Sequence, residues 1–326
     1  MTKDIKPVLI TCGEPAGIGP EIAVAAWQSL KNDIPMIWMG DPRHLPEQTP
    51  VKRLGDLSEW DGRFGDALSV LTYKFAGDAR RGTADPANAA GVIRVIADAV
   101  ALVQSGAASA LCTAPIHKKA LKDGADFAYP GHTEYLAALS GTHGRAVMML
   151  ASDKLRIVPA TIHIPLNRVP LELTPALLRE TIEITDRAMR EKFGVPKPRL
   201  AIAGLNPHAG EGGAIGEEEV DWIADLLENM RCEGFDLAGP LPADTMFHAA
   251  ARARYDAAIA MYHDQALIPI KTLDFDRGVN VTLGLPFVRT SPDHGTAFDI
   301  AGIGIANPTS MIEAIRLAAK MASASA

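Results

Sequence analysis

Residues 257–271 read AAIAMYHDQALIPIK, and this stretch decides how the rest of the chain can be arranged. Its first six residues are apolar and predict a short buried strand, and His263 follows at the point where that strand ends. Two earlier segments have the same layout. The apolar run 155–162 leads into His163, and the run 200–206 leads into His208 through a proline. The repeated pattern predicts neighbouring strands of one parallel sheet.

In open parallel sheets, ligands bind just outside the carboxyl ends of the strands. We therefore expect His163, His208 and His263 to converge on one point. Three neutral imidazoles with an open fourth position form a catalytic site for zinc or a similar borderline ion. Each histidine by itself has an ordinary alternative, because the chain contains nine and a lone histidine is more often a surface or hydrogen-bonded core residue.

Bulk composition narrows the class of protein. A chain of 326 residues is too long for one small core and predicts two domains. The net charge of −7, with no basic stripe, argues against nucleic-acid binding, so a bound anion must be met by local positive charge. The three cysteines are widely spaced and include no CxxC pair, which argues against a disulfide framework.

The hydropathy pattern argues against a membrane partner. The N-terminal sequence MTKDIKPVLITCGEP leads directly into a predicted strand and lacks the layout of a signal peptide. The most apolar long segment, residues 91–114, is interrupted by Arg94, Asp98 and Gln104, so no membrane span fits there. We expect a soluble, cytoplasmic protein.

A glycine-rich turn, GEPAGIGP at residues 13–20, joins the first predicted strand to a helix over residues 21–30. Such a turn presents backbone N–H groups to an anion, although a plain structural turn is an equal alternative. The chain has no GxGxxG, no Tyr-x-x-x-Lys pair and no Gly-Lys-Ser/Thr, so neither a dinucleotide fingerprint nor a P-loop is present.

Further candidate positions lie at predicted helix starts and in loops. Asp85 and Pro86 open a helix that ends at Gly106. His132 and Thr133 follow a glycine at the start of another helix, where they form either an anion-binding pocket or a cap. Asp244 is either an N-cap or a carboxylate directed at the metal site. Residues 286–302 predict a long connection, and loops of that length are usually functional.

Several motifs occur in an order that resembles one family, the 4-hydroxythreonine-4-phosphate dehydrogenases of pyridoxal-phosphate biosynthesis, over essentially the whole chain. These motifs are GEPAGIGPE, GHTE, NPHAGEGG, LPADT, MYHDQ, RGVNVTLGLPFVRTS and DHGTAFDIAG. The resemblance implies an α/β protein with the isocitrate/isopropylmalate dehydrogenase-like fold, in which two α/β domains flank an interdomain cleft. Residues 1–131 plus 276–326 would form the nucleotide-side domain, and residues 132–275 the metal-binding and dimerisation domain.

The resemblance also implies roles for individual residues. It makes the three histidines ligands of a divalent metal (zinc, magnesium or cobalt), and it implies a homodimer whose active site lies at the subunit interface. The trio then need not converge within one chain. The substrate contacts carried over are His132, Thr133, Lys271, Asn280 and Arg289, and Lys271 or Asp244 is the candidate proton acceptor.

The segment HGTAFDIAGIGIANP is similar to the nucleotide-binding loop of isopropylmalate dehydrogenases. That likeness implies that Asp299 binds the adenosine ribose and that Asn307 lies near the adenine of NAD or NADP. It also explains how a dehydrogenase can lack a Rossmann fingerprint.

The implied reaction is the NAD(P)- and metal-dependent oxidation of 4-phosphohydroxy-L-threonine to 2-amino-3-oxo-4-phosphooxybutanoate. This product decarboxylates to 3-amino-2-oxopropyl phosphate. Residues 274–276 (Asp-Phe-Asp) and those beyond Gly302 depart from the family pattern and leave a sugar-acid phosphate, threonate or erythronate 4-phosphate, as an alternative substrate. Two alternatives belong to other classes. A metal-dependent hydrolase or lyase would not respond to NAD, and an acyl-phosphate transferase would not respond to chelation.

Overall fold

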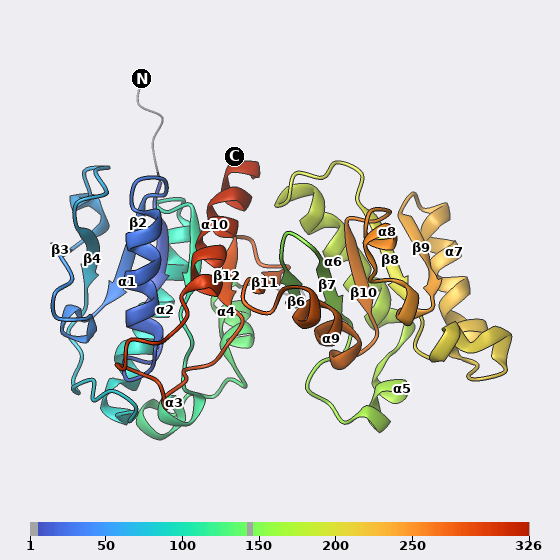
Figure 1. The fold of residues 1–326 in the computed structure, drawn as a ribbon, viewed down its shortest axis with the longest axis horizontal. Coiled ribbons are helices and arrows are strands. Elements are labelled where there is room, and N and C mark those ends of the chain that lie inside the picture. Colours follow the sequence, from blue (N-terminus) through green and yellow to red (C-terminus); the bar gives the residue numbers. More distant parts are fainter. Residues whose placement is uncertain (1–5, 142–145, 326) are drawn as a thin grey trace. The chain divides into compact units, whose positions relative to one another are not determined.

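The structure, a computed structural model, describes residues 6–141 and 146–325. The chain divides into two compact units, one comprising Met1–Ala146 and Leu285–Ala324 and the other Val147–Gly284 (Figure 1). The domain boundaries were predicted after residues 131 and 275. In the structure the chain passes from one unit to the other after Ala146 and after Gly284. The nucleotide and metal roles assigned to the two domains stay predictions.

The first unit is built on a parallel sheet with the strand order β3-β4-β2-β1-β5-β12. All five neighbouring pairs run parallel. Strands covered on both faces need continuous apolar sequence, which is what β1, β2 and β5 have. The strands are β1 (Val8–Thr11), β2 (Met36–Gly40), β3 (Val51–Leu54), β4 (Leu68–Thr72), β5 (Ala110–Thr113) and β12 (Arg289–Pro292).

The helices predicted after the glycine-rich turn, after Asp85 and at His132 are present. Pro20 lies in the first turn of α1, and the Asp85 carboxylate accepts a hydrogen bond of 3.0 Å from the Ala87 N–H, which opens η3 and α2. Gly106 ends α2 in a left-handed conformation. The helices are α1 (Gly19–Leu30), η1 (Pro42–His44), η2 (Leu57–Glu59), η3 (Pro86–Asn88), α2 (Ala89–Gln104), α3 (Lys118–Ala125), α4 (His132–Ser140) and α10 (Thr309–Ala324).

One helix in the described part of the chain, Pro86–Gln104, is long and apolar enough to cross a membrane by length and composition alone. Its apolar side is buried within the unit through Val92, Val95, Ile96, Ala99, Val100 and Val103. The other side carries an ion pair between Arg94 and Asp98 at 3.5 Å. Core packing therefore accounts for the hydropathy of this helix.

The second unit contains a mixed sheet with the strand order β11-β6-β7-β10-β8-β9. β6 pairs antiparallel with β11 and β7, whereas β7, β10, β8 and β9 run parallel. The predicted α/β class is confirmed. The strands are β6 (Val147–Ala151), β7 (Arg156–Pro159), β8 (Arg199–Ala203), β9 (Asp236–Leu241), β10 (Ala257–Ala260) and β11 (Val279–Leu283).

The helix after Thr174 begins with a side-chain cap, because the Thr174 hydroxyl accepts a hydrogen bond of 3.2 Å from the Leu177 N–H. The helices of the second unit are η4 (Leu166–Arg168), α5 (Val169–Glu172), α6 (Pro175–Glu191), η5 (Pro207–Gly213), the π-helical turn η6 (Glu219–Ile223), α7 (Ala224–Cys232), η7 (Ala243–Thr245), α8 (Ala249–Arg252) and α9 (His263–Asp274).

Part of the predicted long connection is in fact a strand. Residues 289–292 form β12, which is buried and pairs with β5, so the prediction of a loop throughout 286–302 is wrong. The sequence RTSP is polar and ends in proline, which hid the strand from a hydropathy pattern. A buried arginine is tolerated there because the Thr113 hydroxyl accepts hydrogen bonds from its guanidinium at 2.7 and 3.2 Å.

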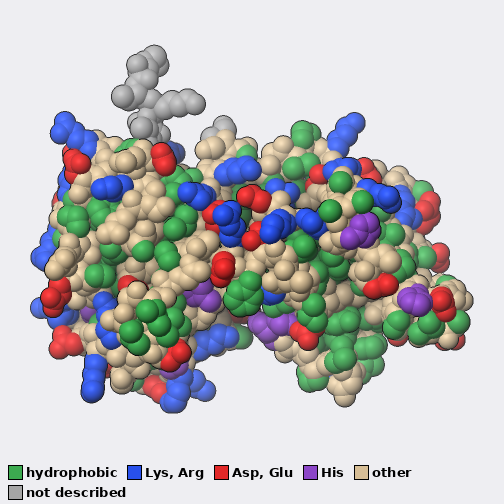
Figure 2. All heavy atoms as spheres, in the orientation of Figure 1, with side chains coloured by type: hydrophobic (Ala, Val, Ile, Leu, Met, Phe, Trp, Pro, Cys, Tyr) green, Lys and Arg blue, Asp and Glu red, His purple; other side chains and the backbone are tan. Residues whose placement is uncertain are grey.

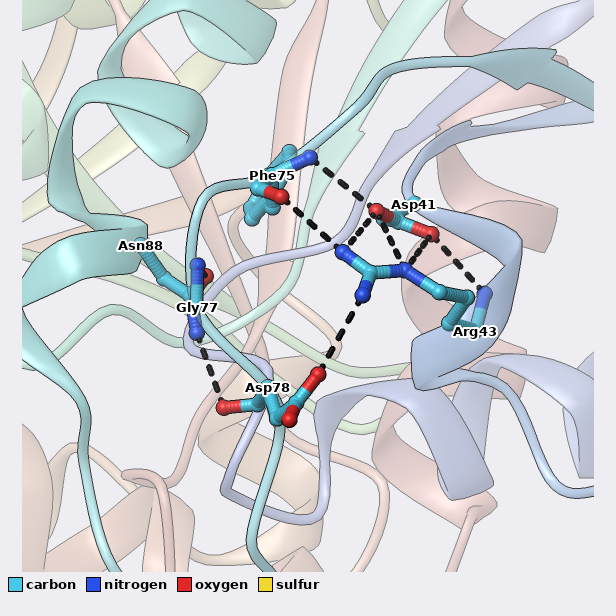
Figure 3. A network of polar contacts seen from close by, with 6 residues as sticks. All are labelled: Asp41, Arg43, Phe75, Gly77, Asp78 and Asn88. Carbon is cyan, nitrogen blue, oxygen red and sulfur yellow. Dashed lines mark hydrogen bonds and ion pairs between the residues drawn. The ribbon is translucent and has the colours of Figure 1, made fainter.

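A buried carboxylate connects the loops that follow β2 and β4 (Figure 3). Asp41 accepts hydrogen bonds from the Arg43 guanidinium (2.8 Å) and from the Phe75 N–H (3.0 Å). Arg43 also donates to the Phe75 carbonyl (2.9 Å) and pairs with Asp78 (3.2 Å). Burial alone would raise the pKa of Asp41, but the donors from Arg43 and Phe75 lower it to about 2.

We expect Asp41→Asn to lower the free energy of unfolding by about 2 kcal/mol at pH 7, because the folded pKa of Asp41 lies below its ordinary value of 3.8. A depressed carboxyl pKa contributes stability above the unfolded pKa and loses it as pH falls through the folded pKa. The difference between wild type and variant should therefore shrink between pH 4 and pH 2. Urea unfolding at pH 7 and pH 3 measures it, and equal differences at both values would contradict this role.

Candidate functional site

Three neighbouring parallel strands each lead into one of the predicted metal ligands. β10 pairs with β7 on one side and with β8 on the other, so the carboxyl ends of all three lie at the same edge. His163 follows β7, His208 lies in η5 after β8, and His263 begins α9 after β10. The strand-end placement inferred from the sequence is therefore the placement in the structure.

Two of the three imidazoles lie side by side within the chain. The ring centroids of His163 and His263 are 5.7 Å apart. Over residues 6–141 and 146–325, no three His, Cys, Asp or Glu side chains form a group that could hold a metal ion. The expected convergence of the trio within one chain is thus not found there. His208 lies instead in a left-handed turn, with its ring bonded to Glu211.

The donor chemistry at these histidines nevertheless fits a divalent cation. His263 Nδ1 lies 2.7 Å from Asp264 Oδ1, and His208 Nδ1 lies 3.0 Å from Glu211 Oε1. Each of these two rings is oriented through Nδ1, and its Nε2 is the nitrogen available to a cation. Metal-binding histidines commonly have their second nitrogen bonded to a carboxylate in this way. The hydrogen bond and charge of Glu211 raise the pKa of His208, and Asp244 adds to the effect.

The backbone at two of these histidines is strained. His163 and His208 have φ values of +50° and +52°, and Ala209 and Glu211 after His208 also lie in the left-handed region. A non-glycine residue in that region costs on the order of 1 kcal/mol. Such strain persists only where the surrounding structure holds it, and it is concentrated at functional sites.

One side chain connects the ends of the central strands. Gln265 Oε1 accepts a hydrogen bond from the Met261 N–H (2.6 Å), and its Nε2 donates to the Gly204 carbonyl (2.8 Å). The Thr161 hydroxyl donates to the Met261 carbonyl (2.8 Å). The ends of β7, β10 and β8 are therefore joined by side-chain hydrogen bonds two to four residues from the histidines. Sequence reasoning missed this role for Gln265, although it lies in the MYHDQ motif.

A second group of predicted site residues lies in the first unit. Arg289 on β12 is buried, and burial lowers its pKa to about 10, so it remains charged at pH 7. His132 begins α4, and burial and the Arg289 charge lower its pKa well below the ordinary value. Its Nε2 is enclosed and has no hydrogen-bond partner among the residues that the structure describes. Thr113, the partner of Arg289, is the last residue of β5 and was not singled out by the sequence.

The remaining predicted substrate and catalytic residues are spread over several elements. Thr133 lies in the first turn of α4 and is partly exposed. Asn280 lies on β11, and its Oδ1 is enclosed without a hydrogen-bond donor in the described part of the chain. Lys271 lies near the end of α9 with its Nζ 5.1 Å from the centre of the Phe275 ring. Asp244 is exposed in η7, within electrostatic range of His208.

The predicted cofactor residues lie on the segment before α10. Asp299 is exposed, and Asn307 Oδ1 accepts hydrogen bonds from the N–H (3.0 Å) and hydroxyl (2.7 Å) of Thr309, so it also caps α10. The GEPAGIGP turn packs against this segment, because the Ile18 N–H donates to the Thr296 carbonyl at 3.0 Å. The turn therefore lies beside the segment that is predicted to bind the nucleotide.

We expect Gln265→Leu to lower the free energy of unfolding by about 1–3 kcal/mol, because it leaves the Met261 N–H and the Gly204 carbonyl without their partner. Gln28→Leu is the matched control: Gln28 is exposed on α1, and its replacement should change stability by less than about 0.5 kcal/mol. Urea unfolding of both variants tests this, and equal stability of the two would contradict the connecting role of Gln265.

Comparison with known proteins identifies relatives along the full chain. The family model described as pyridoxal phosphate biosynthetic protein PdxA matches residues 30–318. The 4-hydroxythreonine-4-phosphate dehydrogenase of Roseobacter denitrificans is 68% identical over 322 residues, covering 99% of each chain. The protein of the same name from a Ruegeria species is 66% identical over 322 residues, covering 99% of this chain and 98% of its own.

A solved structure agrees with these sequence matches. The crystal structure of 4-hydroxythreonine-4-phosphate dehydrogenase from Klebsiella pneumoniae matches with a TM-score of 0.89 and 38% identity, covering 99% of each chain. The family and the dehydrogenase class predicted from the sequence motifs are confirmed. The chain belongs to the 4-hydroxythreonine-4-phosphate dehydrogenase (PdxA) family, the dehydrogenases of pyridoxal phosphate biosynthesis.

Proposed function

We propose that the chain oxidises 4-phosphohydroxy-L-threonine with NAD or NADP and a divalent metal. The product is 2-amino-3-oxo-4-phosphooxybutanoate, which decarboxylates to 3-amino-2-oxopropyl phosphate. Family membership supports the substrate. One structural observation carries the metal dependence: three adjacent parallel strands, β7, β10 and β8, each lead into a histidine at the same sheet edge.

His163, His208 and His263 would hold the cation, with zinc, cobalt or magnesium as the candidates. Imidazole donors favour zinc or cobalt among these. A bound divalent cation supplies Lewis-acid chemistry at the substrate hydroxyl that is oxidised. The protein contributes ring orientation, because Asp264 and Glu211 bond the Nδ1 atoms of His263 and His208. Completion of the ligand set by a second subunit is consistent with only two of the rings lying together in one chain.

An anionic group of the substrate would be held in the first unit by Arg289 and the start of α4. The guanidinium is charged at neutral pH and already oriented by Thr113. No side chain among the described residues caps α4, so its first N–H groups are available to an anion. Neutral His132, with its enclosed Nε2, adds one donor or acceptor without a second charge.

Lys271 or Asp244 would accept the hydroxyl proton. Lys271 and Asn280 lie in the same unit as the three histidines, and Asp244 lies within electrostatic range of His208. Asp299 and Asn307 would contact the adenosine part of NAD or NADP. The nicotinamide part of the same cofactor accepts the hydride. Because Asn307 also caps α10, nucleotide binding and the start of that helix would be coupled.

A homodimer would bury apolar side chains that the single chain leaves in solvent. Leu166, Leu171, Ile268 and Phe275 of the second unit are 71%, 67%, 63% and 70% exposed. Figure 2 shows hydrophobic side chains gathered on the second unit in the region of α5. Clustered exposed apolar surface is typical of a protein interface. The enzyme would act in the cytoplasm on a small phosphorylated substrate.

The decisive experiment follows NADH or NADPH formation with 4-phosphohydroxy-L-threonine beside threonate and erythronate 4-phosphates, each with and without a chelator. We expect turnover of the first substrate only, and loss of turnover on chelation. Faster turnover of threonate or erythronate 4-phosphate would show that a sugar-acid phosphate is the substrate. Full activity after removal of the metal would refute the metal role.

We expect His208→Ala to lower kcat/KM at least about 100-fold, because a metal ligand matters more than the groups that orient it. His248→Ala is the matched control. His248 is exposed in the same unit, at the start of α8, and should leave kcat/KM unchanged. Both variants are measured at fixed metal concentration, with circular dichroism to verify the fold. Wild-type kcat/KM in the first variant would exclude His208 from the site.

We expect Leu171→Glu to shift the chain from dimer to monomer at micromolar concentration, because a buried charge at an apolar interface is costly. Phe64→Glu, on an apolar side chain of the first unit that is 36% exposed, serves as the control and should leave the dimer intact. Light scattering coupled to size exclusion measures the mass. A monomeric wild type, or a dimeric Leu171→Glu variant, would remove this surface from the proposed interface.

A further inference from the structure

The segment that carries His208 is a left-handed helical turn. Five successive residues, His208 to Gly212, have φ values of +52°, +53°, +79°, +46° and +67°. Three of them, His208, Ala209 and Glu211, are not glycine and are disfavoured in this conformation. Such a conformation persists only where the surrounding structure holds it.

A buried carboxylate lies against this turn. Glu219 is 3% exposed, and both of its oxygens accept hydrogen bonds from Asn206, two residues before His208. Oε1 accepts from the Asn206 backbone N–H at 2.8 Å, and Oε2 accepts from the side-chain Nδ2 at 2.9 Å. Glu219 therefore binds both the backbone and the side chain of Asn206 at the start of the turn.

The glycines of the turn show how closely the carboxylate is packed. A Cβ atom at Gly210 would lie 2.7 Å from Glu219 Oε2, closer than real Cβ contacts allow. A Cβ atom at Gly204 would lie 3.0 Å from Glu219 Oε1 and 2.8 Å from the Ala209 Cα. The carboxylate thus lies between the end of β8 and the left-handed turn, in contact with both.

Glu219 comes from an unusual element. It is the first residue of the π-helical turn Glu219–Ile223, and π-helical turns are rare and occur frequently at functional sites. Its neighbours differ from it. Glu217 is exposed, and Glu218 reaches only the Asn206 side chain, at 2.7 Å. Only Glu219 of these three acids is buried and contacts the Asn206 backbone.

We propose that Glu219 is a positioning residue that holds the left-handed turn in the shape in which His208 presents its imidazole to the metal. This role rests on the metal-binding function proposed above for His208. Glu219 does not contact the metal itself. Its carboxylate acts through Asn206 and the turn, so its replacement should weaken metal binding while leaving the ligand side chains unchanged.

Glu219→Gln in the full-length protein is the test, because glutamine keeps the size but replaces one acceptor oxygen by a donor that faces an Asn206 donor. The probe is Co²⁺, added to the metal-free protein without substrate and followed by visible absorption. We expect the Kd for Co²⁺ to rise about 10-fold to 100-fold, as for other groups that orient metal ligands. Excess Co²⁺ should return kcat toward the wild-type value.

Glu217→Gln is the matched control, because Glu217 is exposed in the same acidic run. It removes one negative charge and keeps both Glu219 bonds to Asn206, so the Kd for Co²⁺ should stay within about twofold of wild type. An equal loss in Glu217→Gln and Glu219→Gln would mean that charge alone attracts the ion, and would overturn the positioning role of Glu219.

His208→Ala separates this inference from the proposed function. If His208→Ala binds Co²⁺ as tightly as wild type, the metal role of His208 fails. If His208→Ala loses Co²⁺ but Glu219→Gln keeps wild-type affinity, the metal role stands and the positioning role is overturned. Should Glu219→Gln fail to fold by circular dichroism, Asn206→Ala removes the side-chain bonds to Glu219 Oε2 and Glu218 Oε2 and keeps the backbone bond to Glu219 Oε1. A smaller rise in Kd then supports the role, and an unchanged Kd overturns it.

Discussion

The parallel pairing of β7, β10 and β8 is the constraint on which the candidate metal site depends. Parallel strands end at a common edge, so residues separated by 45 and 55 positions in sequence are delivered to one side of the sheet. Antiparallel pairing of any one strand would send its histidine to the opposite edge. The apolar sequences of the three strands stabilise the pairing, and Gln265 and Thr161 fix the strand ends where the backbone ladder stops.

Strand pairing alone does not orient the imidazoles. His163 and His208 lie in the left-handed region, where a side chain is disfavoured, and such a conformation persists only where the surrounding structure holds it. At His208 we assign that role to Glu219, which accepts hydrogen bonds from Asn206. Without the hydrogen bonds from Asn206, the buried Glu219 carboxylate would lose these donors. The turn and the carboxylate therefore stabilise each other. A relaxed turn would relieve the strain at His208 and lose this hydrogen bonding.

How much the sequence could predict depends on how local each signal is. An apolar run followed by a histidine, as at His263, is a local pattern that predicts where a strand ends. An aspartate followed by a proline, as at Asp85, is a local pattern that predicts where a helix starts. The buried strand at Arg289 was not, because its polarity is compensated by Thr113, which is 176 positions away. The left-handed turn has no local signal either, since its shape depends on Glu219, thirteen positions from Asn206. Residues that position others, such as Gln265, have no composition signature of their own.

In the first unit, the positive charge predicted to bind an anion comes from one buried arginine, not from an excess of basic residues. The chain is acidic overall, yet it keeps one guanidinium buried beside a histidine whose pKa is lowered. If His132 were protonated, two cations would repel each other in a medium that screens poorly. A neutral imidazole avoids that repulsion and keeps Arg289 charged, since the pKa of Arg289 still lies near 10. The pair therefore offers a single positive charge with an adjoining neutral hydrogen-bonding group, which suits an anion that carries a hydroxyl beside its charge.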